Sequence, residues 1–184
     1  PDCIDNSYEA NIGDNAYYPK NGDEYSHSRG HQLPSADRTK SVADNQTTFY
    51  ATNMTPQLYS LNGVKWAALE NDVRNMICSD TLYVVTGAHF DGSQGVAYDN
   101  KGKGKACAVP THYYKVLLRT KSGNSGKRVQ ECSANELQCI GYWVEHSGSA
   151  TIQTKSVAEI EALTGFTFFA NVPNAPKESK SWTY

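Results

Sequence analysis

The stretch 28–74 decides the fold of this chain. It opens with Ser-Arg-Gly-His (28–31), continues with Thr-Asn-Met-Thr-Pro-Gln (52–57) and closes with Trp-Ala-Ala-Leu-Glu-Asn-Asp-Val-Arg (66–74). A histidine, asparagines, a glutamate and arginines stand here at fixed intervals, on what reads as strand, loop and helix. Gly30, within the opening run, suggests a bend or a close backbone approach beside His31. No other part of the chain concentrates as much usable chemistry.

Residue types within this stretch predict its secondary structure. Residues 47–52 are β-branched and aromatic, which predicts a strand that ends in a loop around Pro56. From Gly63 onward apolar residues recur every three or four positions, which predicts a helix that ends near Cys78. Its predicted apolar face consists of Trp66, Leu69, Val73, Met76 and Ile77. Asn62 stands where the N-cap of this helix belongs.

The remaining segments alternate predicted strands with connections. Strands are expected at 81–88, 112–120 and 138–146, the first of them buried. A short helix is expected from Ser156, because Glu159 follows at the spacing of a capping box. The other segments read as an irregular lead-in at 1–27, a glycine-rich loop at 91–105, a flexible connection at 121–127, and a coil tail with Pro173 and Pro176.

Length and composition restrict the class of protein. The chain has 184 residues, enough for one domain with a single core. No apolar run approaches a membrane span, and the opening Pro1-Asp2-Cys3 does not resemble a signal peptide. The net charge is -2, from 17 basic and 19 acidic residues. This balance argues against a constitutive nucleic-acid-binding protein, yet it allows an enzyme with a local basic site.

Cysteine spacing argues against a zinc site. The five cysteines lack any C-x-x-C pair; they are Cys3, Cys78, Cys107, Cys132 and Cys139. An odd number leaves at least one thiol free or paired outside this chain. In an oxidising compartment, Cys132 and Cys139 are close enough in sequence to bridge a loop.

Each candidate site residue has an ordinary structural explanation when taken alone. His31 could be a surface histidine, and Asn62 a helix cap. Asn53 could belong to a turn. Glu70 and Arg74, four residues apart, could form a solvated pair on a helix surface. The combination, rather than any single residue, carries the functional argument.

That combination resembles the DNA/RNA non-specific endonuclease family, the ββα-metal nucleases. The family motif is Asp-Arg-Gly-His, then Asn-x-[Ser/Thr]-Pro-Gln, then Asn, Trp, Glu and Arg on the following helix. This chain matches the motif in order and spacing, except that Ser28 stands where the family has Asp. The runs 109–116 and 164–173 resemble a later strand and the C-terminal signature of the family. The family usually carries more chain and a further strand before the motif, so we expect the sheet here to lack an edge strand.

Carried over by position, the resemblance implies a role for each matching residue. His31 matches the general base that activates water, and Asn62 matches the ligand of a divalent metal. Glu70 matches the acid that hydrogen-bonds the waters of this metal. Asn53 matches an active-site asparagine that supports the base and the metal region. Arg29 and Arg74 match arginines that steady the phosphate.

These roles form a coherent reaction. A neutral imidazole with a pKa near 6.5 accepts a proton from water at physiological pH. A hydrated Mg²⁺ tolerates a single neutral oxygen ligand from protein and polarises the phosphate. Arginines add bidentate donors to phosphate oxygens. A site that reads only phosphate and metal geometry does not distinguish bases, or DNA from RNA.

The resemblance therefore implies an α+β fold with a central, mainly antiparallel sheet and a ββα-metal (His-Me finger) active site. We expect one nuclease domain over 1–184, with its catalytic core at 28–78. The expected activity is Mg²⁺-dependent hydrolysis of DNA and RNA that leaves 5′-phosphates, with Mn²⁺ or another divalent ion as an alternative cofactor. A secreted or periplasmic bacterial setting fits such a degradative enzyme.

Two alternatives belong to other classes. One is a nucleic-acid-binding module whose catalysis has decayed, but simple phosphate binding requires none of His31, Asn62 and Glu70. The other is a metal-dependent phosphodiesterase for small nucleotides, which a closed cleft would favour. Cleavage of plasmid DNA and RNA with Mg²⁺ or with EDTA discriminates among the three.

Overall fold

The computed structural model describes residues 27–97 and 107–183. These residues form two compact units. The first comprises 27–70, 88–97, 107–112 and 145–150, and the second comprises 71–87, 113–144 and 151–183. The predicted lead-in lies outside the described residues except for His27, and so does most of the predicted glycine-rich loop.

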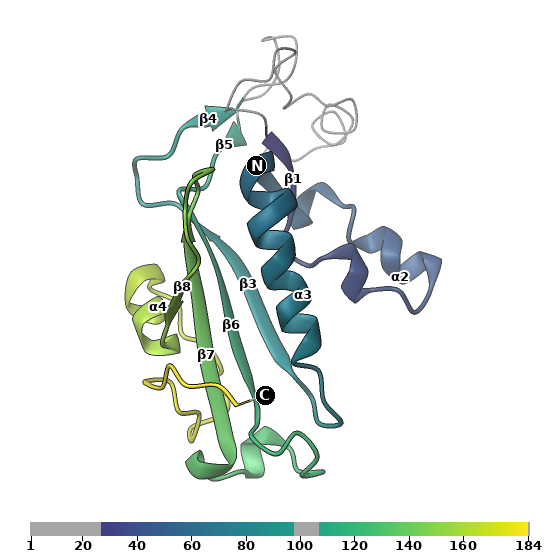
Figure 1. Cartoon of the computed structure of the whole chain (residues 1–184), viewed down its shortest axis with the longest axis vertical. Helices are drawn as coiled ribbons and strands as arrows, with labels where there is room; N and C mark the ends of the chain where they lie inside the picture. Colours follow the sequence, from purple (N-terminus) through teal and green to yellow (C-terminus); the bar gives the residue numbers. More distant parts are fainter. Residues whose placement is uncertain (1–26, 98–106, 184) are drawn as a thin grey trace. The chain divides into compact units, whose positions relative to one another are not determined.

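A small hairpin followed by a helical segment dominates the first unit (Figure 1). Strand β1 (His27–His31) pairs antiparallel with β2 (Met54–Leu58), so that His31 lies opposite Met54 and Ser28 opposite Gln57. The connection contains the 3₁₀ turn η2 (Ser35–Asp37), helix α2 (Val42–Thr47) and the 3₁₀ turn η3 (Ala51–Asn53). After β2 come the wide helical turn η4 (Leu61–Trp66) and α3 (Ala67–Asn75). Strands β4 (Val96–Ala97) and β5 (Cys107–Ala108) form a second, separate pair.

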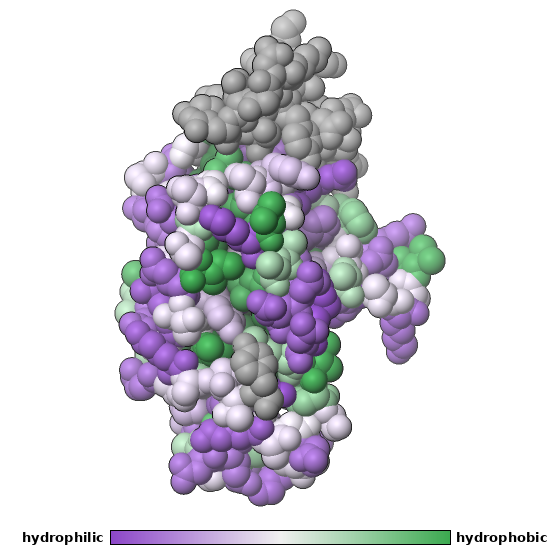
Figure 2. Space-filling view, viewed as in Figure 1, coloured by the Kyte–Doolittle hydropathy of each residue, from purple (hydrophilic) through white to green (hydrophobic). Residues whose placement is uncertain are grey.

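The predicted strand at 47–52 is wrong. Helix α2 ends at Thr47, and a turn at 48–50 and the 3₁₀ turn η3 follow it. The Ser41 hydroxyl caps α2 by accepting a hydrogen bond from the Asp44 N–H at 3.0 Å. No residue of α2 is buried, and hydrophilic side chains cover most of it on the visible face (Figure 2). The strand starts at Met54, and Pro56 lies inside it rather than ending it. A proline fits there because both members of a two-stranded sheet are edge strands.

The helix after β2 starts earlier and is wider than predicted. The Ala67 N–H bonds to the Asn62 carbonyl five residues back, the spacing of a π-helix. Ser60 is the N-cap residue, so the prediction of Asn62 as N-cap is wrong. Four residues of the predicted apolar face are buried, namely Trp66, Leu69, Val73 and Met76. Ile77 is 67% exposed, because α3 ends at Asn75 and the chain leaves the helical path.

A four-stranded sheet organises the second unit, and it is antiparallel as predicted. Its strand order is β3-β6-β7-β8, with β3 (Tyr83–His89), β6 (His112–Thr120), β7 (Leu137–Glu145) and β8 (Gln153–Lys155). The predicted bounds of β6 are confirmed, and those of β7 are correct to within a residue. Strand β3 is an edge strand whose Tyr83, Val84 and Val85 are exposed, so the prediction that it is buried is wrong.

The core of the second unit lies between the sheet and helix α4 (Val157–Thr164), which runs beside β7 and β8 in Figure 1. The predicted capping box is confirmed: Ser156 Oγ accepts from the Glu159 N–H, and the Glu159 carboxylate accepts from the Ser156 N–H. The helix ends at Gly165, whose φ of 74° suits glycine. No helix or strand follows in the described tail, as predicted.

The predicted bridge between Cys132 and Cys139 does not form. Both are buried free thiols, one in the loop after a 3₁₀ turn and the other within β7. Cys132 Sγ donates instead to the Arg128 carbonyl at 3.4 Å, and burial raises the pKa of the Cys139 thiol to about 12. Cys78 is a free thiol as well. Within the described ranges no helix is long and apolar enough to span a bilayer.

Candidate active site

His31 is the last residue of β1, and only one of its two ring nitrogens makes a hydrogen bond to a described residue. Nδ1 lies 3.2 Å from the Arg29 carbonyl oxygen. A carbonyl only accepts hydrogen bonds, so Nδ1 carries the proton and Nε2 keeps its lone pair. Nε2 is buried and has no hydrogen-bond partner among the described residues. The tautomer that this contact selects is the one that a proton acceptor at Nε2 requires.

The surroundings of His31 also favour the neutral ring. Burial lowers the pKa of His31 below its ordinary 6.5, and the charge of Arg29 lowers it further. The hydrogen bond to the Arg29 carbonyl opposes both effects without reversing them. Phe49 packs edge-on against the imidazole, with ring centroids 5.3 Å apart. The ring is therefore held in place and neutral at pH 7.

Gly30 makes the predicted close approach beside His31. A Cβ at this position would lie 2.6 Å from both Cβ and Oε1 of Gln57 on β2, so only glycine fits. Side chains alternate along β1, and Ser28 and Gly30 are buried while Arg29 is exposed. Arg29 and His31 therefore share the other face of the strand.

Asn62 lies against β1 through Ser28. Its amide nitrogen donates to Ser28 Oγ at 2.8 Å, and the Ser28 hydroxyl donates to the Gln57 carbonyl at 3.2 Å. Asn62 Oδ1 accepts no hydrogen bond from any described residue. The residue predicted to bind metal thus keeps its one ligating oxygen available.

Asn53 acts on the backbone around His31 rather than on the imidazole. Its Oδ1 accepts from the Leu33 N–H at 2.9 Å. Its Nδ2 donates to the Leu33 carbonyl at 2.9 Å and to the Thr48 carbonyl at 2.8 Å. These three bonds fix the chain just after His31 to the turn that carries Phe49. Asn53 therefore holds the segment that presents the base.

Glu70 and Arg74 both lie on α3. Glu70 is half-buried at the end of the first unit. Arg74 belongs to the second unit, where its guanidinium donates to Asn71 Oδ1 at 2.6 Å. They are four residues apart on this helix, and both have further partners. Their catalytic roles stay predictions.

The described contacts join some predicted site residues and leave others apart. Ser28 and Asn62 are in direct contact, and Asn53 reaches the backbone that follows His31. The side chains of His31, Asn53 and Asn62 make no hydrogen bonds to one another. The described part of the chain holds no group of three or more His, Cys, Asp or Glu residues arranged to bind a metal. A hydrated cation on one amide oxygen requires no such group.

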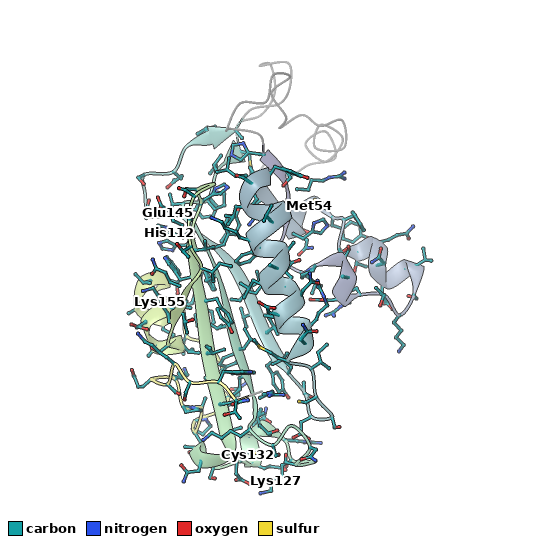
Figure 3. The ribbon with its side chains drawn as sticks, in the orientation of Figure 1. Met54, His112, Lys127, Cys132, Glu145 and Lys155 are labelled. Carbon is teal, nitrogen blue, oxygen red and sulfur yellow. The ribbon has the colours of Figure 1, made fainter. Side chains whose placement is uncertain are left out.

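His146 is a half-buried supporting residue that the sequence motifs did not reveal. Its Nε2 accepts from the Leu58 N–H at 2.7 Å, and its Nδ1 lies 2.6 Å from the Pro110 carbonyl. The His27 ring packs against it at 5.8 Å. His112 and Glu145 lie near each other at the adjacent strand ends (Figure 3). His146 thus fixes the end of β2, just before the turn that carries Asn62. No motif in the sequence predicts this role.

The donor set fits a hard, hydrated divalent cation. Asn62 offers an amide oxygen whose nitrogen is already occupied, and Glu70 offers a carboxylate on the same helical segment. Oxygen ligands of this kind suit Mg²⁺, which keeps most of its waters. Asn62 would hold the ion directly, and Glu70 would accept hydrogen bonds from its waters.

The chain is similar in sequence to known nucleases. The sequence profile described as DNA/RNA non-specific endonuclease matches residues 4–175. A nuclease of Nostoc sp. is 36% identical over 152 residues, which cover 79% of this chain and 52% of that protein. Human mitochondrial endonuclease G is 37% identical over 102 residues, which cover 52% of this chain and 34% of that protein.

The fold is similar to a solved structure as well. The crystal structure of the EndoG/EndoGI complex contains a chain that matches with a TM-score of 0.59 and 24% identity, over 86% of this chain and 63% of that one. The chain belongs to the DNA/RNA non-specific endonuclease family. It spans about half the length of the Nostoc relative.

Proposed function

We propose that this chain is a Mg²⁺-dependent nuclease that hydrolyses phosphodiester bonds of DNA and RNA and leaves 5′-phosphates. One observation carries the proposal: the Arg29 carbonyl holds the Nδ1–H tautomer of His31 and leaves the Nε2 lone pair open. A neutral, oriented imidazole with a lowered pKa is what a general base for water needs.

His31 Nε2 takes a proton from the attacking water in this mechanism. The bound cation would supply charge neutralisation on the phosphate and the leaving oxygen. Asn62 would hold this cation, and Glu70 would orient its waters. Arg29, on the same strand face as His31, and Arg74 donate to phosphate oxygens as negative charge develops. Asn53 keeps the loop after His31 in position.

None of these groups reads a base edge. Contacts to phosphate and sugar carry no direct sequence information, so cleavage is expected on DNA and RNA of any sequence. The chain is slightly acidic overall, and substrate is therefore held by a few local cations. A secreted or periplasmic setting for such an enzyme stays a prediction.

Plasmid DNA and a structured RNA, each incubated with the chain, test the proposal. With Mg²⁺ we expect nicking of the plasmid and fragmentation of the RNA, with 5′-phosphate ends that a 5′-phosphate-dependent exonuclease degrades. EDTA is expected to stop both reactions, and Asn62→Ala to require far more metal. Binding of either nucleic acid without cleavage would favour the decayed module, and cleavage in EDTA would exclude the metal mechanism.

A further inference from the structure

We infer that Ser28, in the position where the family carries Asp, is a positioning residue that fixes which end of the Asn62 amide is presented for metal binding. This inference rests on the proposed function. Its geometric basis is one chain of hydrogen bonds, Asn62 Nδ2 to Ser28 Oγ at 2.8 Å and Ser28 Oγ to the Gln57 carbonyl at 3.2 Å.

The single hydroxyl hydrogen of Ser28 fixes the donor and the acceptor in both of these hydrogen bonds. The Ser28 hydroxyl has one hydrogen, and the Gln57 carbonyl can only accept it. Ser28 Oγ therefore meets Asn62 with lone pairs, and only the NH₂ end of the amide can approach it. A rotated amide would place two oxygens against each other. Asn62 Oδ1 is consequently turned away from Ser28, and no described residue donates to it.

The burial of Ser28 and Gln57 stabilises this orientation of the Asn62 amide. Ser28 is 7% exposed and Gln57 is fully buried, so water competes poorly for the hydroxyl. Ser28 and Gln57 are directly opposed in the β1–β2 pair, which holds the acceptor carbonyl in place. The asparagine has one oxygen and one nitrogen at nearly equivalent positions. Only the oxygen binds a cation, so the orientation decides whether a ligand exists.

Manganese binding in the absence of nucleic acid tests the inference. The full chain is titrated with Mn²⁺ in Mg²⁺-free buffer, and free Mn²⁺ is followed by electron paramagnetic resonance. Residues that orient a metal ligand typically change affinity by about 10- to 100-fold when replaced. We expect Ser28→Ala to raise the Kd for Mn²⁺ by about 10-fold or more. Ser60→Ala is the matched control, because Ser60 starts the same helical segment and makes no side-chain capping bond.

A double-mutant cycle shows whether the effect runs through the amide. Asn62→Asp has two equivalent oxygens, so its metal binding does not depend on which end faces Ser28. We expect Ser28→Ala to change the Kd less than about 2-fold in the Asn62→Asp background, against about 10-fold in the wild type. Ser28→Asp accepts from the Asn62 amide as Ser28 does, and it is expected to restore tight binding. Thermal unfolding confirms that each variant is folded.

The outcomes separate the two claims. Wild-type chain that binds no Mn²⁺ would overturn both the metal mechanism and this inference. Wild type that binds Mn²⁺, beside an equally tight Ser28→Ala, would overturn the role of Ser28 alone. An equal loss from Ser28→Ala in the wild-type and Asn62→Asp backgrounds would also overturn it, because the effect would then not depend on amide orientation.

Discussion

Replacing His146 is expected to weaken the joint between β2 and the helical segment that carries Asn62. The imidazole accepts from the Leu58 N–H and donates to the Pro110 carbonyl. His146→Leu leaves both backbone groups without this partner in a half-buried place. An unmade hydrogen bond of this kind costs about 1–3 kcal/mol. Because solvent partly reaches the site, we expect about 2–3 kcal/mol in total, a fall in Tm of about 5–10 °C.

The same residue makes stability depend on pH. Burial lowers the pKa of His146, and nearby His112 lowers it further, while the Pro110 hydrogen bond raises it. In the unfolded chain the ring titrates near its ordinary 6.5, so between the two pKa values the unfolded state binds more protons. The contribution of His146 is thus present above pH 6.5 and is lost as the pH falls toward the folded pKa.

Thermal unfolding from pH 5 to 8 measures both effects. The groups around His146 are His27 on β1, His112 on β6 with Asp91 beside it, and Glu145 on β7. His146→Gln can still donate and accept but does not titrate. It should retain more stability than His146→Leu. The number of protons taken up on unfolding should fall by up to one, so that Tm rises less steeply with pH. A Leu variant with wild-type Tm, or an unchanged pH slope in both variants, would refute the reasoning.

Three further predictions concern the proposed site. Glu70→Gln and Arg74→Ala should each lower kcat by about 10²- to 10³-fold with little change in Tm. Unchanged kcat in both variants would show that these residues have no catalytic role and are ordinary residues of a helix surface. Asn53→Ala removes three side-chain bonds to backbone and should lower stability by about 2 kcal/mol or more together with kcat, so a fall in kcat at constant Tm would show a direct chemical role instead. The logarithm of the nucleic-acid affinity should fall with the logarithm of salt concentration at a slope set by roughly three to five phosphate contacts, and a slope near ten would reveal a basic surface overlooked on this acidic chain.

Sequence patterns predicted the elements that local rules control. Strand β6 and helix α4 followed from apolar runs and from the Ser156 capping box. The apolar face of α3 through Met76 was equally clear, because its residues repeat with helical spacing. Gly30 signalled a close approach, and the structure supplies the partner, Gln57.

Errors arose where tertiary contacts override local preference. The aromatic run around Phe49 looks like a strand, but helix α2 ends just before it at Thr47, and Asn53 holds the following turn by donating to the Thr48 carbonyl. Strand β2 forms around Pro56 because β1 pairs with it. Asn62 resembles an N-cap, yet its amide bonds across to Ser28. His146 could not be predicted at all, since its two backbone partners lie 88 and 36 residues away.

The most direct test of the central claim is the turnover of His31→Ala beside the wild type. Both are assayed on supercoiled plasmid at saturating Mg²⁺, with Tm measured on the same samples. Because the open Nε2 of His31 is assigned the proton of the attacking water, we predict that kcat falls by about 10²-fold or more while Tm stays within a few degrees. A folded His31→Ala variant that cleaves plasmid at close to the wild-type rate would contradict the account.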